Sequence, residues 1–305
     1  MLKRFAHVVA KPPRSRSQRE ELEGEIAALR QEGHAISLHY GTSTGDAARL
    51  AREASEAGAE LVIAAGGDGT INEVVNGLVE AGGGAALGVV PLGTANDFAR
   101  GLGLPRELAA ALRLAVEGRP RTLDVAQVNG HCFINVSTGG FGAAATRAAN
   151  RTVKRLLGPL AYLARGARML VRFQPAHGVF EADGRQVYSG RFVFFAVGNA
   201  SRTGGGTPVT PLADPGDGRL DVVILCDVSR FQLLRMLPRL RAGTHMRNPY
   251  VLYMRAHQVT VTLGAPARIN ADGEAVEGQE FRYSVLTNGL NVVGAMDEAD
   301  KDPDD

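Results

Sequence analysis

The chain has 305 residues, of which 45% are hydrophobic and 22% charged, so its composition fits one large or two ordinary globular domains. Trp is absent and aromatic residues make up only 6%, which argues against base stacking and therefore against nucleic acid as a partner. The formal charge of +2 includes an acidic tail at 297–305 with a net charge of −5, which we expect to be disordered.

The first third of the chain alternates short apolar runs with helical patterns. Strands are expected at Phe5–Ala10, Ala35–Tyr40, Leu61–Ala65 and Ala86–Val90, and helices at Gln18–Arg30, Asp46–Ala57, Ile71–Val79 and Glu107–Glu117. The third of these strands is apolar on both faces, as a central parallel strand should be. This alternation predicts a doubly wound, Rossmann-like α/β domain over residues 1–123.

After Arg121 strand-like runs dominate, and several are separated by Asn-Gly or Asp-Gly turns. The expected strands are Leu123–Val128, Cys132–Val136, Gly178–Ala182, Gln186–Tyr188, Arg191–Val197, Leu220–Leu225, Gln258–Leu263 and Arg268–Asn270. Helical segments are expected at Ala144–Phe173 and Arg230–Ala242. We therefore predict an antiparallel β domain over 124–287, with the chain returning to the first domain near 288–296.

A glycine-rich loop, Gly66-Gly67-Asp68-Gly69-Thr70, closes the third strand and opens a helix. Glycines there let backbone N–H groups approach phosphate oxygens, and the helix N-terminus adds the positive end of its dipole. The loop fits neither GxxxxGK[ST] nor GxGxxG, which disfavours a P-loop NTPase and a standard dinucleotide fold. A plain turn with a helix-capping Asp is the alternative, although such a turn needs neither Asp68 nor Thr70.

A second loop, Pro91–Phe98 (PLGTANDF), follows the next strand and again supplies a glycine, a hydroxyl, an amide and a carboxylate. Because both loops end parallel strands, we expect them to face each other at one edge of the sheet. Asp68 and Asp97 would then hold Mg²⁺, directly or through water, against nucleotide phosphates. Asp97 is equally well interpreted as the N-cap of the next helix.

The two motifs GGDGTINE, from Gly66, and PLGTANDFA, from Pro91, resemble the diacylglycerol kinase catalytic family, and in particular bacterial YegS-type lipid kinases. The similarity covers nearly the whole chain. It implies an NAD kinase- or phosphofructokinase-like α/β domain, a C-terminal antiparallel β-sandwich domain, and a nucleotide cleft between them. It also implies transfer of the ATP γ-phosphate to a lipid hydroxyl.

The resemblance assigns roles to particular residues. Those implied to contact the nucleotide are Thr42, Gly66, Gly67, Asp68, Gly69, Thr70, Ile71, Asn72, Gly93 and Thr94. Asp68, Asp97 and Asp124 resemble carboxylates that organise the catalytic Mg²⁺. Glu274, in an Asp-Gly-Glu segment, resembles the general base. Asp217, with main-chain groups of Asp214 and Arg219, resembles a second, structural Mg²⁺ site.

Glu274 also has a physical rationale, because a lipid hydroxyl is a weak nucleophile and needs a carboxylate to accept its proton. From the residues alone, an exposed hairpin carboxylate is the simpler interpretation. The chain lacks the NPxSG loop that many family members carry after the first strand, and Lys11, Arg14 or Arg16 are candidates to supply charge in its place.

Arginines alternate with apolar residues at Arg151–Arg172 and Arg230–Arg247, a pattern typical of helices on anionic membranes and equally of arginine stems packed over a helix. Together the observations predict an ATP- and Mg²⁺-dependent lipid kinase, acting on a lipid such as diacylglycerol or phosphatidylglycerol. We expect it to be cytoplasmic and peripheral to a membrane, as a monomer or homodimer. The competing hypotheses are a kinase of a soluble acceptor, such as NAD or a sugar phosphate, and a non-catalytic nucleotide-binding regulator.

Overall fold

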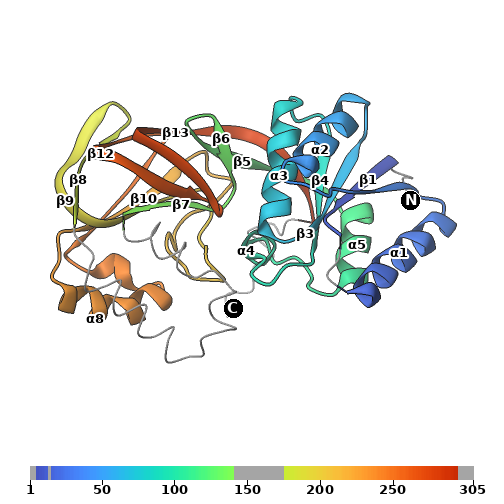
Figure 1. The fold of residues 1–305 in the computed structure, drawn as a ribbon, viewed down its shortest axis with the longest axis horizontal. Helices are drawn as coiled ribbons and strands as arrows, with labels where there is room; N and C mark the ends of the chain where they lie inside the picture. Colours follow the sequence, from blue (N-terminus) through green and yellow to red (C-terminus); the bar gives the residue numbers. More distant parts are fainter. Residues whose placement is uncertain (1–4, 13–14, 141–174, 295–305) are drawn as a thin grey trace. The chain divides into compact units, whose positions relative to one another are not determined.

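The computed structural model describes residues 5–12, 15–140 and 175–294, which divide into two compact units. Unit 1 comprises the chain up to Val125 and the segment from Leu286 onward, and unit 2 is Ala126–Val285. Two strands pass from one unit to the other, β5 (Pro120–Val128) and β13 (Glu274–Val293) (Figure 1). The expected helix at Ala144–Phe173 and the acidic tail lie outside the described residues.

Unit 1 is built on a parallel sheet in the order β2-β1-β3-β4, with the end of β13 added parallel to β4. Its strands are β1 (Phe5–Ala10), β2 (Ala35–Tyr40), β3 (Leu61–Gly66) and β4 (Ala86–Pro91), close to the ranges expected from their apolar runs. Its helices are α1 (Arg16–Gln31), α2 (Asp46–Glu56), α3 (Asp68–Glu80), α4 (Asp97–Gly101) and α5 (Leu108–Glu117).

Helices cover both faces of this sheet. The apolar sides of α1 and α5 pack with β1 and β3 in one core, whose members include Leu22, Ile26, Leu112 and Ile63. On α3, Gly77 lies so close to α2 that a Cβ there would stand 2.1 Å from the Ala48 carbonyl oxygen. Such a close crossing requires glycine and fixes α3 against α2. The predicted doubly wound α/β arrangement is confirmed.

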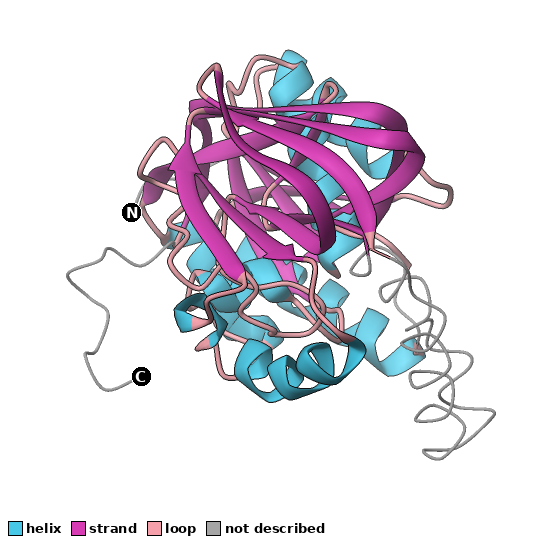
Figure 2. Ribbon diagram, turned by 90° about the vertical axis from the view of Figure 1, so that its left-hand side faces the viewer, coloured by secondary structure: helices cyan, strands magenta, loops and turns pink. Residues whose placement is uncertain are grey.

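Unit 2 is almost entirely antiparallel, and its long strands curve around an apolar core (Figure 2). The strands are β6 (His131–Phe133), β7 (Val136–Gly140), β8 (Ala176–Ala182), β9 (Arg185–Gly198), β10 (Leu220–Cys226), β11 (Val251–Ala256) and β12 (Gln258–Ala271). Long strands β9 and β12 both pair with β7 near one end and with β8 near the other. Figure 2 shows the curved strands in magenta.

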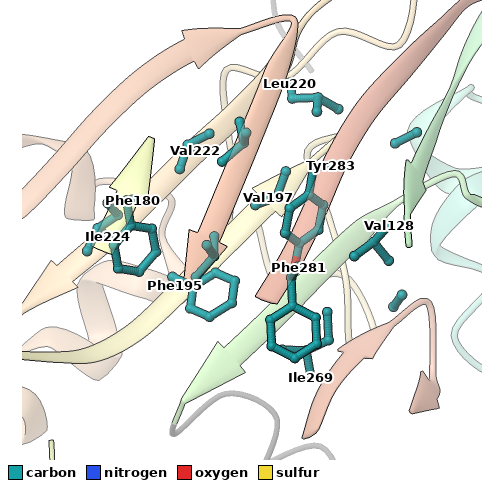
Figure 3. Close-up of a cluster of buried hydrophobic side chains, with 14 of the residues drawn as sticks. Val128, Phe180, Phe195, Val197, Leu220, Val222, Ile224, Ile269, Phe281 and Tyr283 are labelled. Carbon is teal, nitrogen blue, oxygen red and sulfur yellow. The ribbon is translucent and has the colours of Figure 1, made fainter. Parts of the chain in front are cut away.

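The core of unit 2 lies between its strands and is rich in phenylalanine. Phe180, Phe192 and Phe195 meet edge to face, with ring centroids 5.2 to 5.7 Å apart, and Phe281 is also fully buried. Figure 3 shows part of this cluster. A second apolar cluster seats α8 (Arg230–Arg241) and the 3₁₀ turn η1 (His245–Arg247) against the sheet through Leu233 and Met236.

Candidate active site

The glycine-rich loop lies at the carboxyl end of β3, between Gly66 and the first turn of α3. Gly67 is the N-cap residue in an extended conformation, and no side chain caps this helix. The first N–H groups of an α-helix have no partner within the helix, and they carry the positive end of its dipole. An uncapped, glycine-lined helix N-terminus offers free N–H groups and a positive potential to an anion such as phosphate.

Asp68 ties this loop to the second one. Its Oδ2 accepts the Asn96 N–H at 3.0 Å and its Oδ1 accepts the Asp97 N–H at 2.6 Å. The loop backbones also touch, because a Cβ built on Gly93 would stand 2.5 Å from the Gly67 Cα. Asn96 adopts a left-handed conformation with φ 51°, and its Nδ2 donates to the carbonyls of Pro91 and Gly93. The two predicted loops therefore form one unit.

The side chains expected to contact a nucleotide differ in their exposure. Gly69 and Thr94 are exposed at the surface of the paired loops, whereas Ile71 is fully buried and belongs to the core. Thr70 is 3% exposed, and its side chain fills the space beside Gly66. Ile71 and Thr70 therefore offer backbone groups rather than side chains. Asn72 is 1% exposed, and its Oδ1 has no hydrogen-bond partner among the described residues.

Glu73, which the sequence analysis did not single out, links three segments at this edge of the sheet. The residue is buried on α3, where its Oε1 accepts from the Lys11 Nζ at 3.0 Å and its Oε2 from the Gly45 N–H at 3.2 Å. Lys11 follows β1, and Gly45 lies in the loop after β2. In the sequence, only the position of Glu73 one helical turn after Gly69 could have indicated this bridge.

Of the three basic residues that could replace the NPxSG loop, Lys11, Arg14 and Arg16, the two that the structure describes differ in position and in ion pairing. Lys11 stays 46% exposed while paired with Glu73, so its ammonium remains open to solvent at the carboxyl end of β1. Arg16 instead pairs with Glu20 on the outer face of α1. Arg14 lies outside the described residues. Lys11 is thus the candidate that stands among the strand ends.

Thr42 lies in the loop before α2, where it holds Asp46. Its N–H and Oγ1 donate to the Asp46 Oδ2, which also accepts the Ser43 N–H. Hydrogen bonds from Ser43 and Thr42 lower the pKa of this carboxyl to about 2. The hydroxyl of Thr42 is therefore engaged in shaping its own loop.

Asp124 lies apart from Asp68 and Asp97. On β5 its Oδ1 accepts the Asn288 N–H at 2.9 Å, and the neighbouring Gly289 carbonyl approaches Gly83, which precedes β4. Since β13 pairs with β4 near the start of that strand, Asp124 lies at the amino end of β4, whereas both loops lie at the carboxyl ends. The described hydrogen bonds therefore join Asp68 to the backbone of the Asp97 loop and Asp124 to Asn288, and the shared role of the three carboxylates stays a prediction.

Glu274 begins β13 directly after a two-residue turn at Asp272-Gly273, in which both residues have positive φ (48° and 97°). The Asp272 carboxylate is buried and accepts the N–H groups of Ile134, Asn135 and Val136. These bonds fix the hairpin to β7, while Glu274 itself is exposed. Asp272 was missed as a positioning residue, since its sequence context indicated only a turn.

The predicted second metal segment is a loop of local turns in unit 2. Asp214 accepts the Gly216 N–H and Asp217 accepts the Arg219 N–H, each through Oδ1 at 3.0 Å. Nearby Asp221 is fully buried, and its Oδ2 has no hydrogen-bond partner among the described residues. Burial raises the pKa of Asp221, while the Tyr253 hydroxyl and Arg255 act in the opposite direction and the carboxylates of Asp217 and Asp214 add to the rise.

One trio of described residues, Glu32, His34 and Glu117, already brings three metal-ligand atoms within 4.8 Å of one another. Arg113 binds both glutamates at 2.8 Å, which makes the cluster an ion-pair network between α1 and α5. A cation would have to displace that guanidinium. We assign no metal to this trio.

Models of two known protein domains match this chain, one over most of unit 1 and one over most of unit 2. Residues 7–128 match the diacylglycerol kinase catalytic domain, and residues 135–294 match the YegS C-terminal NAD kinase beta sandwich-like domain. The chain belongs to the diacylglycerol kinase catalytic-domain family. This match confirms the resemblance that the two loop motifs indicated, and it shows that the chain is a member of a kinase family.

Relatives of this lipid kinase family match over most of their length. A diacylglycerol kinase of Bacillus subtilis (strain 168) is 36% identical, over 90% of this chain and 91% of its own. A probable YegS-like lipid kinase of Pseudomonas aeruginosa (strain PAO1) is 37% identical, over 90% and 89%.

Solved structures agree on the fold. A putative diacylglycerol kinase from Bacillus anthracis str. Sterne superposes with a TM-score of 0.82 at 22% identity, covering 98% of this chain and 97% of that one. An NAD kinase from Archaeoglobus fulgidus in complex with ATP gives a TM-score of 0.54 at 15% identity, covering 96% and 94%. The predicted combination of an NAD kinase-like α/β fold with a β-sandwich is therefore confirmed.

Proposed function

We propose that this family member transfers the γ-phosphate of ATP to the hydroxyl of a lipid such as diacylglycerol or phosphatidylglycerol. The observation that carries the proposal is the uncapped N-terminus of α3, held by Asp68 against the loop that begins at Pro91. It supplies the backbone donors that a nucleotide polyphosphate needs. Lys11 adds a partly exposed positive charge at the same edge.

Mg²⁺ fits the donor set of this edge. Asp68 and Asp97 are hard oxygen ligands of the kind that Mg²⁺ prefers. Both Asp68 oxygens already accept backbone N–H groups, so the carboxylate keeps only part of its acceptor capacity and suits contact through water. When bound, the ion would neutralise phosphate charge.

A second Mg²⁺ is proposed at the Asp214–Arg219 loop. The support is Asp221, whose buried carboxylate keeps one oxygen without a partner among the described residues beside the acidic loop. The other Asp221 oxygen accepts the Tyr253 hydroxyl and lies 3.7 Å from Arg255, which also lies 3.6 Å from Asp217, so a divalent ion would have to share these carboxylates with that guanidinium. Asp217 and the main-chain carbonyls of Asp214 and Arg219 would complete the ligands.

Glu274 is proposed as the base that accepts the proton of the lipid hydroxyl as the bond to phosphorus forms. Its support is local geometry: the hairpin that presents it is anchored by Asp272, and the carboxylate itself faces solvent. An exposed carboxylate beside a rigid turn is accessible to an incoming acceptor, and the turn fixes the backbone from which it projects. Catalysis would then rest on positioning and charge neutralisation.

The acceptor distinguishes this proposal from a kinase for NAD or a sugar phosphate. The support for a lipid is that relatives at 36–37% identity are named for lipid kinase activity. No described helix is long and apolar enough to cross a bilayer. We also propose that the enzyme is cytoplasmic and meets its substrate at a membrane surface.

The test is lipid-dependent ADP release by the purified protein with ATP and Mg²⁺. Diacylglycerol, phosphatidylglycerol and a sphingoid base are offered in mixed micelles, and NAD and a sugar phosphate in buffer. ADP release that depends on one of the lipids supports the proposal. Release with NAD or the sugar phosphate alone would favour the soluble-acceptor kinase, and ATP binding without any release would favour a regulator.

A further inference from the structure

Helix α8 carries apolar residues on the side that faces away from its core. Leu233, Met236 and Leu240 are spaced three and four residues apart and pack on the sheet of unit 2. Phe231, Leu234 and Pro238 repeat the same spacing about half a turn away, and all three are exposed. Phe231 is 66% exposed and Leu234 is 50% exposed. We call these three residues the outer stripe.

Arginines line both sides of the outer stripe. With 3.6 residues per turn, Arg235 and Arg239 fall on one side of it, and Arg230 and Arg241 on the other. All four are exposed, and the Arg235 guanidinium lies 5.4 Å from the centre of the Phe231 ring. The sequence contains no Asp or Glu from Val228 to Ala271. Nothing acidic on this helix or in the strand after it offsets the arginines.

This combination is the pattern of a helix that lies in the plane of an anionic bilayer. An apolar stripe enters the boundary between headgroups and acyl chains, and the flanking arginines meet lipid phosphates. Contact with a second copy of the same surface is disfavoured, because a two-fold interface would place four arginines against four others. The helix is also firmly built, since a capping box of Ser229 and Gln232 closes its N-terminus.

We propose that the outer stripe of α8 and its arginines are a docking surface for anionic phospholipid bilayers. The inference rests on the proposed function for its purpose, because a lipid acceptor must be taken from a membrane. Binding to a bilayer does not itself require catalysis, so the two claims are tested separately.

The test is sedimentation of the full-length protein with vesicles of phosphatidylcholine alone or with an equal share of phosphatidylglycerol. Phe231→Ser with Leu234→Ser removes the apolar part, and Arg235→Gln with Arg239→Gln removes two charges. The matched controls are Phe5→Ser, which changes an exposed Phe in unit 1, and Arg16→Gln with Arg52→Gln on α1 and α2. Thermal unfolding of each variant is measured alongside.

The wild type should prefer the phosphatidylglycerol vesicles. The apolar double variant should bind them at least about tenfold more weakly, and the arginine variant should lose about tenfold or more. Both controls should bind within about twofold of wild type, because their sites lie off the stripe. The α8 variants should keep their melting temperatures and their lipid-dependent ADP release from mixed micelles.

Wild-type binding that does not depend on phosphatidylglycerol, or unchanged binding by both α8 variants, would overturn the proposal. So would a lowered melting temperature or an altered oligomeric state in the apolar variant, since either would mean that protein covers the stripe. If α8-dependent binding is found without any kinase activity, the docking surface stands and the proposed function fails. If kinase activity is found and the α8 variants bind vesicles as the wild type does, the proposed function stands and the docking surface fails.

Discussion

At the scale of single residues, Asp68 connects the two loops that are proposed to bind the nucleotide phosphates. Its carboxylate accepts the N–H groups of Asn96 and Asp97, and this fixes the second loop against the first. Gly67 and Gly93 permit the close approach that these bonds require. The loop motif thus encodes the backbone geometry on which the proposed contact with phosphate depends.

Two glycine substitutions separate folding from phosphate binding. A Cβ at Gly69 meets no atom within 4 Å, so Gly69→Ala should leave stability unchanged or raise it by about 0.5–1 kcal/mol. The same methyl group would occupy the space of a bound phosphate, and ATP affinity should fall at least about tenfold. Calorimetric titration with ATP and thermal unfolding measure the two effects.

Gly93→Ala is the matched contrast, because its Cβ would stand 2.5 Å from both the Gly67 Cα and the Asn96 Oδ1. We expect it to destabilise unit 1 by roughly 1–3 kcal/mol. A Gly69→Ala protein that binds ATP normally would contradict the assignment of the phosphate site.

Glu274→Gln should lower kcat by about 10²–10⁴-fold, because the amide cannot accept the hydroxyl proton. Its melting temperature should stay at the wild-type value, since the side chain is exposed and the turn is anchored by Asp272. Glu277→Gln, an exposed carboxylate on the same strand that pairs with Arg268, is the control and should remain active. Steady-state kinetics with dispersed lipid provide the measurement, and comparable turnover in both variants would remove Glu274 from the mechanism.

At the scale of elements, unit 1 could be predicted almost completely. β1 and β2 begin and end where their apolar runs do, and β3, which is buried along its whole length, follows its run to within one residue. Unit 2 was harder to predict from sequence. The expected strand at Cys132–Val136 is two strands, since the amides of Ile134 and Asn135 bind the Asp272 carboxylate instead of a neighbouring strand.

The longest strand, β13, was not expected at all. It runs from Glu274 to Val293 and includes Asn288-Gly289, a dipeptide typical of a hairpin turn. Here Asn288 has φ 55° within the strand, and its N–H binds Asp124. That long-range contact, which joins residues 164 positions apart in the chain, overrides the local turn preference. For the same reason the sequence did not indicate that Asp124 lies away from the two loops.

The burial of His245 in η1 should make the free energy of unfolding depend on pH. The pKa of His245 is lowered from 6.5, mainly by burial, and its Nε2 lies 2.9 Å from the Val209 carbonyl oxygen. The folded state therefore binds fewer protons than the unfolded state just below that value. The free energy of unfolding should fall as the pH drops below about 6.5, and this loss ends below the lower, folded pKa.

Urea unfolding at about pH 7.5 and about pH 5.5 measures this effect. His245→Gln should lose part of the difference between the two conditions. His7, whose pKa is lowered by burial and by His39, should keep the remainder. A His245→Gln protein with the full wild-type pH dependence would show that this imidazole does not contribute.

At the scale of the whole molecule, the residues assigned to the reaction belong to two units. Unit 1 carries the paired loops and Lys11, and unit 2 carries Glu274 and the acidic loop beside Asp221. β5 and β13 connect the units, so unit 2 is inserted between the two chain segments that make up unit 1. The family match covers both units, which supports a single function that needs the two together.

The central claim is that the γ-phosphate of ATP reaches a lipid hydroxyl. Parallel incubations with γ-labelled and α-labelled ATP, Mg²⁺ and lipid micelles, followed by organic extraction, test it directly. We predict label in the lipid phase from γ-labelled ATP alone, and none with Glu274→Gln or after chelation of Mg²⁺. Absence of label from every lipid tried, together with phosphorylation of NAD or a sugar phosphate, would contradict the account.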